Sequence, residues 1–185
     1  MKNANLVSLG SRVLAWALLP LFVAACGSGK SSSGPAAAQK TFYDHFAVDV
    51  GGHPASLQVA VLQAELERGL MQRPDLGADE GMFFVYPEPQ AQSFWMRNTP
   101  EPLDLGYLTR DGRIAETYDL LPLDERPVSS HSSDIQFVLE MPKGWFAAHG
   151  VRPGTKVDLA AVAGALRARG FDPVKLGVEK RQAAP

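Results

Sequence analysis

LDLGYLTRDGRIAETYDL, residues 103–120, is the stretch that decides the fold class of this chain. At its centre, Asp111-Gly112 is a dipeptide favoured in tight hairpin turns, because glycine adopts a positive φ without steric cost. The flanking runs, Leu103–Leu108 and Ile114–Leu120, are rich in apolar and aromatic residues and have the length of ordinary strands. The stretch therefore predicts an antiparallel hairpin and places the chain among proteins built mainly from β-structure.

The predicted hairpin also decides which side chains face one another. With a two-residue turn, Asp104 lies directly opposite Asp119, and like charges across a strand pair destabilise it. Relief would come from Arg97 or Lys143, a bound cation, a proton shared by the two carboxyls, or a longer loop that alters the register. Two close carboxyls can serve acid–base chemistry. A longer turn, or two solvated acids, would leave the pair without a chemical role.

Outside this hairpin, short apolar runs alternate with Gly, Pro and Asp. Alternation on both sides of Gly51-Gly52 predicts a hairpin over 46–61, and leucines four residues apart predict a helix near 62–71. Residues 158–169 begin with an aspartate, and the apolar residues that follow lie on one face, which is typical of an amphipathic helix. The predicted fold is mainly β (α+β), a compact antiparallel sheet or barrel-like domain with two or three short helices. Further strands are expected at 82–86, 93–97 and 136–141, and a short helical segment at 144–150.

Residues 1–25 have the organisation of a bacterial signal peptide. Lys2 and Arg12 precede an apolar stretch, residues 13–23. This stretch is too short for a comfortable membrane span. The quartet Val23-Ala24-Ala25-Cys26 resembles a lipobox, which implies a diacylglycerol on the Cys26 sulfur and cleavage before this residue. The alternative is an ordinary cleaved signal peptide with a chance cysteine. We expect an exported protein attached to the membrane through Cys26.

The chain divides into four expected segments. They are the signal peptide 1–25, a flexible tether 26–40, a globular domain 41–157, and a C-terminal helix and tail 158–185. The tether is rich in Gly, Ser and Ala, which bury too little apolar area to offset their ordering entropy. Ser28 stands where an aspartate is associated with inner-membrane retention. In a cell with two membranes, we therefore expect anchoring to the outer membrane, facing the periplasm.

Composition excludes several classes of function. The formal net charge of the 185 residues is -2, and the residues after 25 contain 16 basic and 20 acidic residues, a net charge of -4. Such a domain offers no basic surface for a phosphate backbone, so no nucleic acid is expected as a partner. Cys26 is the only cysteine, which excludes an intrachain disulfide and, once lipidated, thiol chemistry. The four histidines lack metal-site spacing, and we expect no metal and no cofactor.

Residues 94–98 carry the most informative side chains for binding. In a strand, Trp95 and Arg97 share one face and their neighbours share the other. If the neighbours enter the core, an indole and a guanidinium are presented together, with the Asn98 amide at the strand end and Asp104 nearby. An aromatic platform beside a planar cation suits sugars, carboxylates or other anions. The alternative is that Trp95 packs against a helix while Arg97 pairs with an acid such as Glu101 or Asp104.

Several stretches carry a family resemblance, namely Glu67–Met71, Asp79–Pro87, Ser93–Thr99, Pro102–Asp104, Phe137–Glu140, Gly144 and His149-Gly150. Together and in this order they resemble the DUF192 family, a widespread prokaryotic domain of unknown function. The resemblance spans roughly residues 46–157 and implies the family's fold, but it supplies no activity. The chain departs from the family pattern at Arg97, where lysine is common, at Pro100-Glu101, which are usually apolar, and at Thr155, where aspartate is frequent.

The leading hypothesis from the sequence is an envelope-anchored binding or accessory module. Its ligand would be a small or oligomeric molecule, either anionic or a sugar, or else an envelope protein partner. The predicted binding residues are Trp95, Arg97, Asn98 and Asp104.

Two other hypotheses belong to different classes. A hydrolase or transferase acting on envelope material would use Asp104 with Asp119 or Glu140 as acid and base, although no enzyme motif supports it. A structural component of an envelope complex would use the helix at 158–169 as a docking face.

Overall fold

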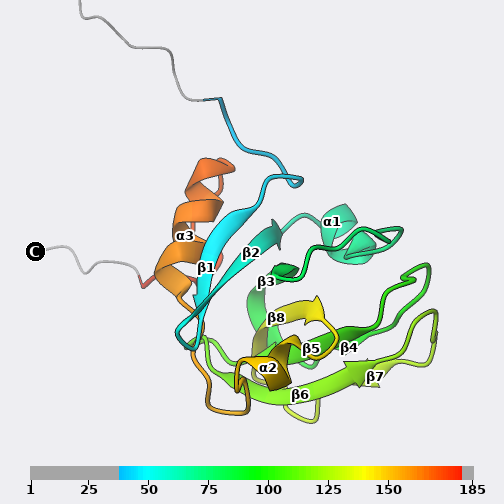
Figure 1. Cartoon of the computed structure of the whole chain (residues 1–185). Coiled ribbons are helices and arrows are strands. Elements are labelled where there is room, and N and C mark those ends of the chain that lie inside the picture. Colours follow the sequence, from blue (N-terminus) through cyan, green and yellow to red (C-terminus); the bar gives the residue numbers. More distant parts are fainter. Residues whose placement is uncertain (1–37, 181–185) are drawn as a thin grey trace, which may run out of the picture. The chain divides into compact units, whose positions relative to one another are not determined.

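The computed structural model describes residues 38–180, which form a six-stranded sheet, a two-stranded sheet and three helices (Figure 1). The mainly β, α+β fold is therefore confirmed. The predictions for the signal peptide, for Cys26 and for the tether before residue 38 lie outside these residues. The strands are β1 (Phe46–Val50), β2 (His53–Ala60), β3 (Glu80–Gln90), β4 (Ser93–Phe94), β5 (Leu103–Leu108), β6 (Ile114–Leu120), β7 (Val128–Ser129) and β8 (Ile135–Pro142). The helices are α1 (Gln63–Arg68), α2 (Trp145–Ala148) and α3 (Leu159–Ala168).

The six-stranded sheet has the order β1-β2-β3-β8-β5-β6 and is mixed. It departs from the antiparallel prediction at one pair, β2 and β3, where Leu57 lies beside Gly81 in parallel register. These strands run parallel because α1 lies in the connection between them, whereas a tight turn would reverse the chain. The sheet does not close into a barrel. Lys156 and Val157 bridge its two edges at one end, where they pair with Arg113 and Val50.

The turn of the hairpin at residues 103–120 is longer than predicted. The Thr109 N–H donates to the Arg113 carbonyl at 3.0 Å, which leaves three residues in the loop instead of two. Ala115 is an extra residue on β6, because Leu108 pairs with Ile114 while the next pair is shifted by one. This bulge restores the predicted register over the rest of the hairpin.

Asp104 and Asp119 consequently lie opposite one another, as predicted. Lys143 relieves their repulsion. Its Nζ lies 3.3 Å from Asp104 Oδ1 and also forms an ion pair with Asp119. Hydrogen bonds to Asp119 and then to Asp104 raise the pKa of Lys143, so its ammonium stays charged at neutral pH.

Strands β3 and β4 begin or end at residues other than those predicted from the sequence. β3 runs through Pro87 and Pro89 to Gln90, with an irregular register that accommodates two residues lacking an N–H. β4 covers only two residues and pairs with β7, which the sequence did not predict. After β4 the chain turns towards another loop, because the Met96 N–H donates to the Asp124 carbonyl at 2.8 Å.

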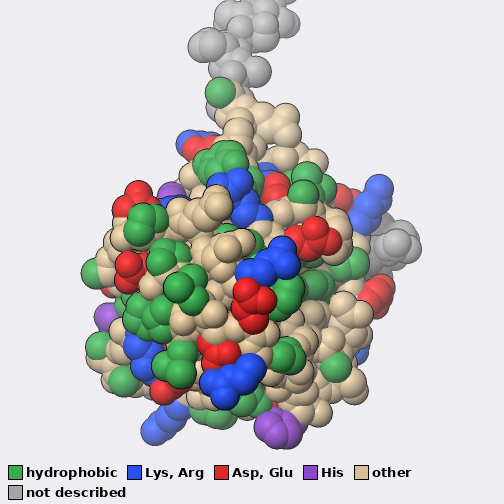
Figure 2. All heavy atoms as spheres, turned by 90° about the vertical axis from the view of Figure 1, so that its right-hand side faces the viewer, with side chains coloured by type: hydrophobic (Ala, Val, Ile, Leu, Met, Phe, Trp, Pro, Cys, Tyr) green, Lys and Arg blue, Asp and Glu red, His purple; other side chains and the backbone are tan. Residues whose placement is uncertain are grey.

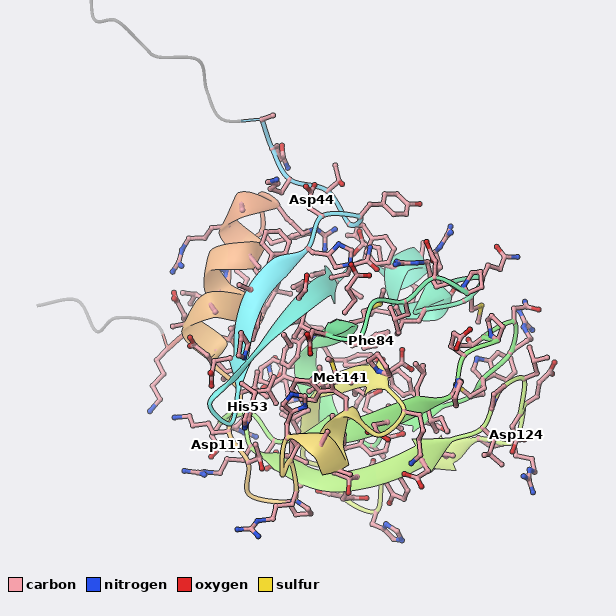
Figure 3. The ribbon with its side chains drawn as sticks, in the orientation of Figure 1. Asp44, His53, Phe84, Asp111, Asp124 and Met141 are labelled. Atoms are coloured by element: carbon pink, nitrogen blue, oxygen red, sulfur yellow. The ribbon has the colours of Figure 1, made fainter. Side chains whose placement is uncertain are left out.

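Side chains from the two faces of the sheet form two apolar clusters. One contains Phe83 and Met141 together with buried side chains of α2 and α3. The other contains Phe84 and Val138 and includes Phe94 of β4. Neighbouring residues of one strand enter different clusters because strand side chains alternate. Phe84 and Met141 both lie inside the molecule (Figure 3).

α3 packs along β1 and β2 (Figure 1). Asp158 begins the helix as predicted, and its carboxylate accepts hydrogen bonds from Ala160 N at 2.9 Å and Ala161 N at 3.2 Å. Val162 and Leu166 are fully buried in the core. The apolar face of α3 is therefore part of the core of the domain, and its buried side chains are not available as a docking face. Within residues 38–180, no helix has the length and apolar character needed to cross a membrane.

Replacing Gly81 with alanine is expected to destabilise the domain by about 2–3 kcal/mol, because an added methyl overpacks the sheet. Its Cβ would lie 2.3 Å from the Glu140 carbonyl oxygen and 2.4 Å from Met141 Sδ. Gly164 is the matched control, since it lies on the exposed side of α3 with nothing within 4 Å of an added Cβ. Gly164→Ala is expected to stabilise by about 0.5–1 kcal/mol. Urea unfolding of both variants checks the opposite signs.

Candidate ligand-binding site

A cavity of about 230 Å³ lies between α1, β3, β4 and β8. Its walls combine apolar and aromatic side chains with a few polar groups, a composition typical of small-ligand sites. The exposed residues Gln63, Glu67 and Trp95 contribute to its lining. The complete lining is Gln63, Leu66, Glu67, Arg68, Gly69, Leu70, Met71, Phe84, Tyr86, Ser93, Phe94, Trp95, Thr99 and Glu140.

The Glu140 carboxyl is the buried polar group of this cavity. The residue is 4% exposed, and its Oε2 has no hydrogen-bond partner among the described residues. Burial disfavours the ionised form and raises the pKa of Glu140 to about 8, so the carboxyl is mainly protonated at pH 7. An unpartnered buried polar group costs free energy, which a ligand that hydrogen-bonds to it recovers.

α1 and the turn after it form the wall beside this carboxyl. The helix begins where the Glu65 carboxylate accepts hydrogen bonds from Val61 N at 2.9 Å and Leu62 N at 3.0 Å. It ends at Gly69, whose φ of 49° favours glycine. A Cβ on Gly69 would lie 3.8 Å from Glu140 Oε2, so the glycine backbone itself borders the carboxyl.

Trp95 and Arg97 lie side by side on the outer face, while Phe94 and Met96 are buried. The predicted alternation is therefore present, although only the first part of this segment is a strand. Trp95 is 43% exposed, and the Arg97 guanidinium lies 4.7 Å from the centroid of its ring. The two side chains thus stack on each other, and of the pair only Trp95 lines the cavity.

The other two predicted binding residues have different surroundings. Asn98 has a positive φ of 56°, and its carbonyl accepts a hydrogen bond from Gln72 N at 2.8 Å. It helps to position the loop but does not line the cavity. Asp104 lies on the opposite face of the sheet, where Oδ2 accepts hydrogen bonds from Gly144 N at 3.0 Å and Phe146 N at 2.8 Å. The structure therefore does not bring Asp104 together with Trp95.

The same geometry separates the carboxyls considered for acid–base chemistry. Asp104 pairs with Met141 of the neighbouring strand β8. Glu140 is adjacent to Met141 in this strand, so Asp104 and Glu140 point to opposite faces of the sheet. Asp104 and Asp119 do share a face, but both form an ion pair with Lys143. The site therefore contains Glu140 without either aspartate.

Sequence reasoning considered Glu140 only as a partner of Asp104 and missed the cavity. A usable signal was present, because Glu140 is an acid within the continuous apolar run of β8. Such a residue is rarely fully buried unless it is paired or functional. No comparable feature of the neighbouring sequence indicates that Gly69 and Phe84 also line this cavity.

Charges around the site show no continuous field of one sign. On the face of the molecule shown in Figure 2, basic and acidic side chains are interspersed. Within residues 38–180, no group of three or more His, Cys, Asp or Glu side chains is arranged to hold a metal ion.

Trp95→Ala is expected to cost about 1 kcal/mol of stability, because this side chain is half-exposed, and to leave the fold intact. The matched control is Phe94→Ala. Phe94 is 9% exposed and its ring meets that of Phe84 edge-on at 4.9 Å, so its loss is expected to cost about 3–4 kcal/mol. Urea unfolding measures both. Equal losses in the two variants would show that Trp95 is a core residue and not a cavity wall.

Comparison with known proteins finds similar folds in two bacterial proteins. The family model of DUF192, described as uncharacterized ACR, matches residues 46–159. A protein of unknown function from Novosphingobium aromaticivorans DSM 12444 is 36% identical, with a TM-score of 0.59, over 62% of this chain and 84% of that one. A Sinorhizobium meliloti 1021 protein, for which a role as a transcription regulator has been suggested, is 30% identical, with a TM-score of 0.60, over 64% of this chain and 96% of that one. No curated protein matches this chain.

Proposed function

This chain belongs to the DUF192 family, and from its own site we propose that it is a binding protein of the cell envelope. Its domain binds a small ligand in the cavity beside Glu140, and a lipid on Cys26 attaches it to the membrane. In a cell with two membranes, the domain faces the periplasm from the outer membrane.

One observation carries the binding proposal, namely the buried Glu140 carboxyl with no partner for Oε2. A carboxyl that only stabilised the fold would be expected to have its hydrogen bonds satisfied within the protein. Here the residue lines an open cavity, so a ligand in that cavity would lie beside the carboxyl. A ligand that hydrogen-bonds to Glu140 would thus recover the free energy that burial of the carboxyl costs.

The cavity walls support the same conclusion. They come from three of the stretches by which the chain resembles its family, around Gly69, Phe84 and Trp95, and from Glu140 in a fourth. These stretches are distant in sequence and meet at one place. We therefore propose the ligand site on the inner side of Trp95, in place of the predicted site at Arg97, Asn98 and Asp104.

Binding is tested by two-dimensional NMR of the isotopically labelled protein with a panel of amines, sugars, carboxylates and peptidoglycan fragments. A ligand of the cavity is expected to shift the amide signals of Gly69, Phe84 and Trp95, and Trp95→Ala is expected to weaken these shifts. Arg97→Ala is the matched control and is expected to have a smaller effect. Shifts confined to Arg97 and Asn98, or no shifts with any compound, would contradict the cavity proposal.

The anchoring proposal rests on residues 1–26 alone. The positive start, the short apolar stretch and the quartet that ends at Cys26 are arranged as in bacterial lipoproteins. Multiple acyl chains provide stable anchoring at ~0.8 kcal/mol per buried CH₂. The expected result is membrane fractionation of the protein and a mass that includes the lipid, both lost in Cys26→Ser. A protein with unmodified Cys26 at its natural location would contradict the proposal.

A second candidate function is a hydrolase or transferase acting on envelope material. The observation that favours it is the pKa of Glu140, raised by burial to about 8, which suits a general acid near neutral pH. The test is release of product from peptidoglycan fragments by the parent protein and by Glu140→Gln. Turnover that disappears in the variant would establish catalysis, and binding without turnover would exclude it for these substrates.

A further inference from the structure

We propose that the cavity binds the primary ammonium group of a small organic amine, with the Glu140 carboxylate as its counter-ion. This inference rests on the proposed binding function and names the chemical class of its ligand. It concerns a free small molecule that presents a terminal ammonium group.

The unsatisfied atom determines which donor is needed. Glu140 Oε2 is buried and accepts no hydrogen bond from the described residues. A primary ammonium group carries three N–H donors and a positive charge, so it provides both the missing hydrogen bond and the missing counter-charge. A quaternary ammonium group has the charge but no donor, and an alcohol has the donor but no charge.

The cavity walls suit a cation with a short apolar chain. Phe84, Phe94 and Trp95 present aromatic rings to the space, and ring faces attract cations. Leu66 and Leu70 add apolar surface for the carbon chain.

The charged and titratable groups around Glu140 add no net charge to the cavity, because Glu67 and Arg68 have opposite charges. From α1 the lining includes Glu67 and Arg68, and the Arg68 guanidinium lies 5.8 Å from the ring centroid of Tyr43. Tyr86 faces Glu140 from β3, and burial keeps the pKa of this phenol well above its ordinary value. Tyr107 faces it from β5, and its hydroxyl donates to the Val128 carbonyl at 2.6 Å. Both phenols are neutral at pH 7. Within the described lining, Arg68 is the single cationic side chain.

Binding moves one proton. Without ligand at pH 7, the Glu140 carboxyl is mainly protonated, because burial raises its pKa to about 8. The ammonium ion enters already charged, the carboxyl O–H bond breaks, and the proton leaves to solvent while the ion pair forms. Release of about one proton is therefore expected for each amine bound at pH 7. The affinity should rise about tenfold between pH 6 and pH 7 and level off near pH 9, about one unit above the pKa of Glu140.

The experiment uses the full chain with its glutamate carboxyls labelled with ¹³C. Four probes of similar size are titrated at pH 6.5, namely propylammonium, tetramethylammonium, propanol and propionate. The expected result is that propylammonium moves the Glu140 carboxyl signal to its ionised position and binds more tightly than the other three. Glu140→Gln should weaken propylammonium binding by about 10- to 100-fold, because it removes a charge-assisted hydrogen bond. Glu67→Gln, which keeps the buried carboxyl, should change it less.

The outcomes separate this inference from the function on which it rests. If propanol or propionate shifts the signals of Gly69 and Phe84 and propylammonium does not, the cavity remains a ligand site and the ammonium proposal is wrong. If propylammonium binds without ionising Glu140, or equally well to Glu140→Gln, the counter-ion role is wrong. If no compound from either panel shifts these signals, the binding function itself fails.

Discussion

Glu140→Gln is expected to stabilise the folded protein by about 3–5 kcal/mol at pH 8 and to change its stability little at pH 4.5. The ordinary pKa of this carboxyl is 4.5, and burial raises it to about 8 in the folded state. Between these values the folded state binds more protons than the unfolded state. The contribution of Glu140 to stability therefore falls as the pH rises from about 4.5 to about 8, because the carboxyl ionises in the unfolded chain while burial keeps it protonated in the folded one.

The measurement is urea unfolding of the parent and the variant at several pH values between 4.5 and 9. Glu125→Gln is the control, because Glu125 lies on the exposed surface and its replacement should produce no such pH-dependent difference. The difference in unfolding free energy between variant and parent isolates the contribution of Glu140. It removes the contribution of acids whose pKa is lowered, and not raised, in the folded state. An example is Glu116, where burial is outweighed by hydrogen bonds from His131, Tyr118 and Ser132, which lower its pKa to about 2. A pH-independent difference for Glu140→Gln would show that the carboxyl is not desolvated.

Arg169→Met is expected to destabilise the protein by about 3–5 kcal/mol, because it leaves a largely buried carboxylate without its cation. The guanidinium of Arg169 forms an ion pair with Glu65 and donates to the Val59 carbonyl, and the side chain is 4% exposed. Glu65 in turn accepts the hydrogen bonds that begin α1. Loss of Arg169 is thus expected to weaken both the attachment of α3 and the helix that borders the cavity.

Arg167→Met is the matched control on the same helix. Arg167 also pairs with an acid, Glu179, but it is 54% exposed, and such pairs contribute at most about 1 kcal/mol. Thermal and urea unfolding compare the two variants. In a double-mutant cycle, Glu65→Gln is expected to cost much less when Arg169 is already replaced. Similar losses for Arg167→Met and Arg169→Met would show that burial does not strengthen the inner pair.

Much of the fold was predictable because its signals are local. The limits of β5 and β6 were predicted correctly from alternating residues around a turn, and Asp158 was recognised as the start of α3. The register of Asp104 against Asp119 was also predicted, with Lys143 among the groups expected to separate them. The parallel pairing of β2 with β3 was not, because it depends on the path of the chain through α1.

The candidate site was only partly predictable. Exposed Trp95 follows from alternation along a short segment, and the structure places it at the cavity. The prediction grouped it with Asp104, which lies on the other face of the sheet. Proximity in sequence between two segments therefore did not reveal on which side of the sheet each side chain lies.

By itself, the sequence determined most of the strands and helices, the position of the hairpin around Asp111-Gly112, and the polar or apolar character of the strand faces. These properties depend on φ preferences and on periodicity within a few neighbouring residues. Only the tertiary structure decided that Glu140 is desolvated beside Gly69, and that Arg169 meets Glu65. Burial and pairing of charges depend on which distant segments pack together, because the surrounding atoms, and not the residue itself, set the cost of removing a charge from water.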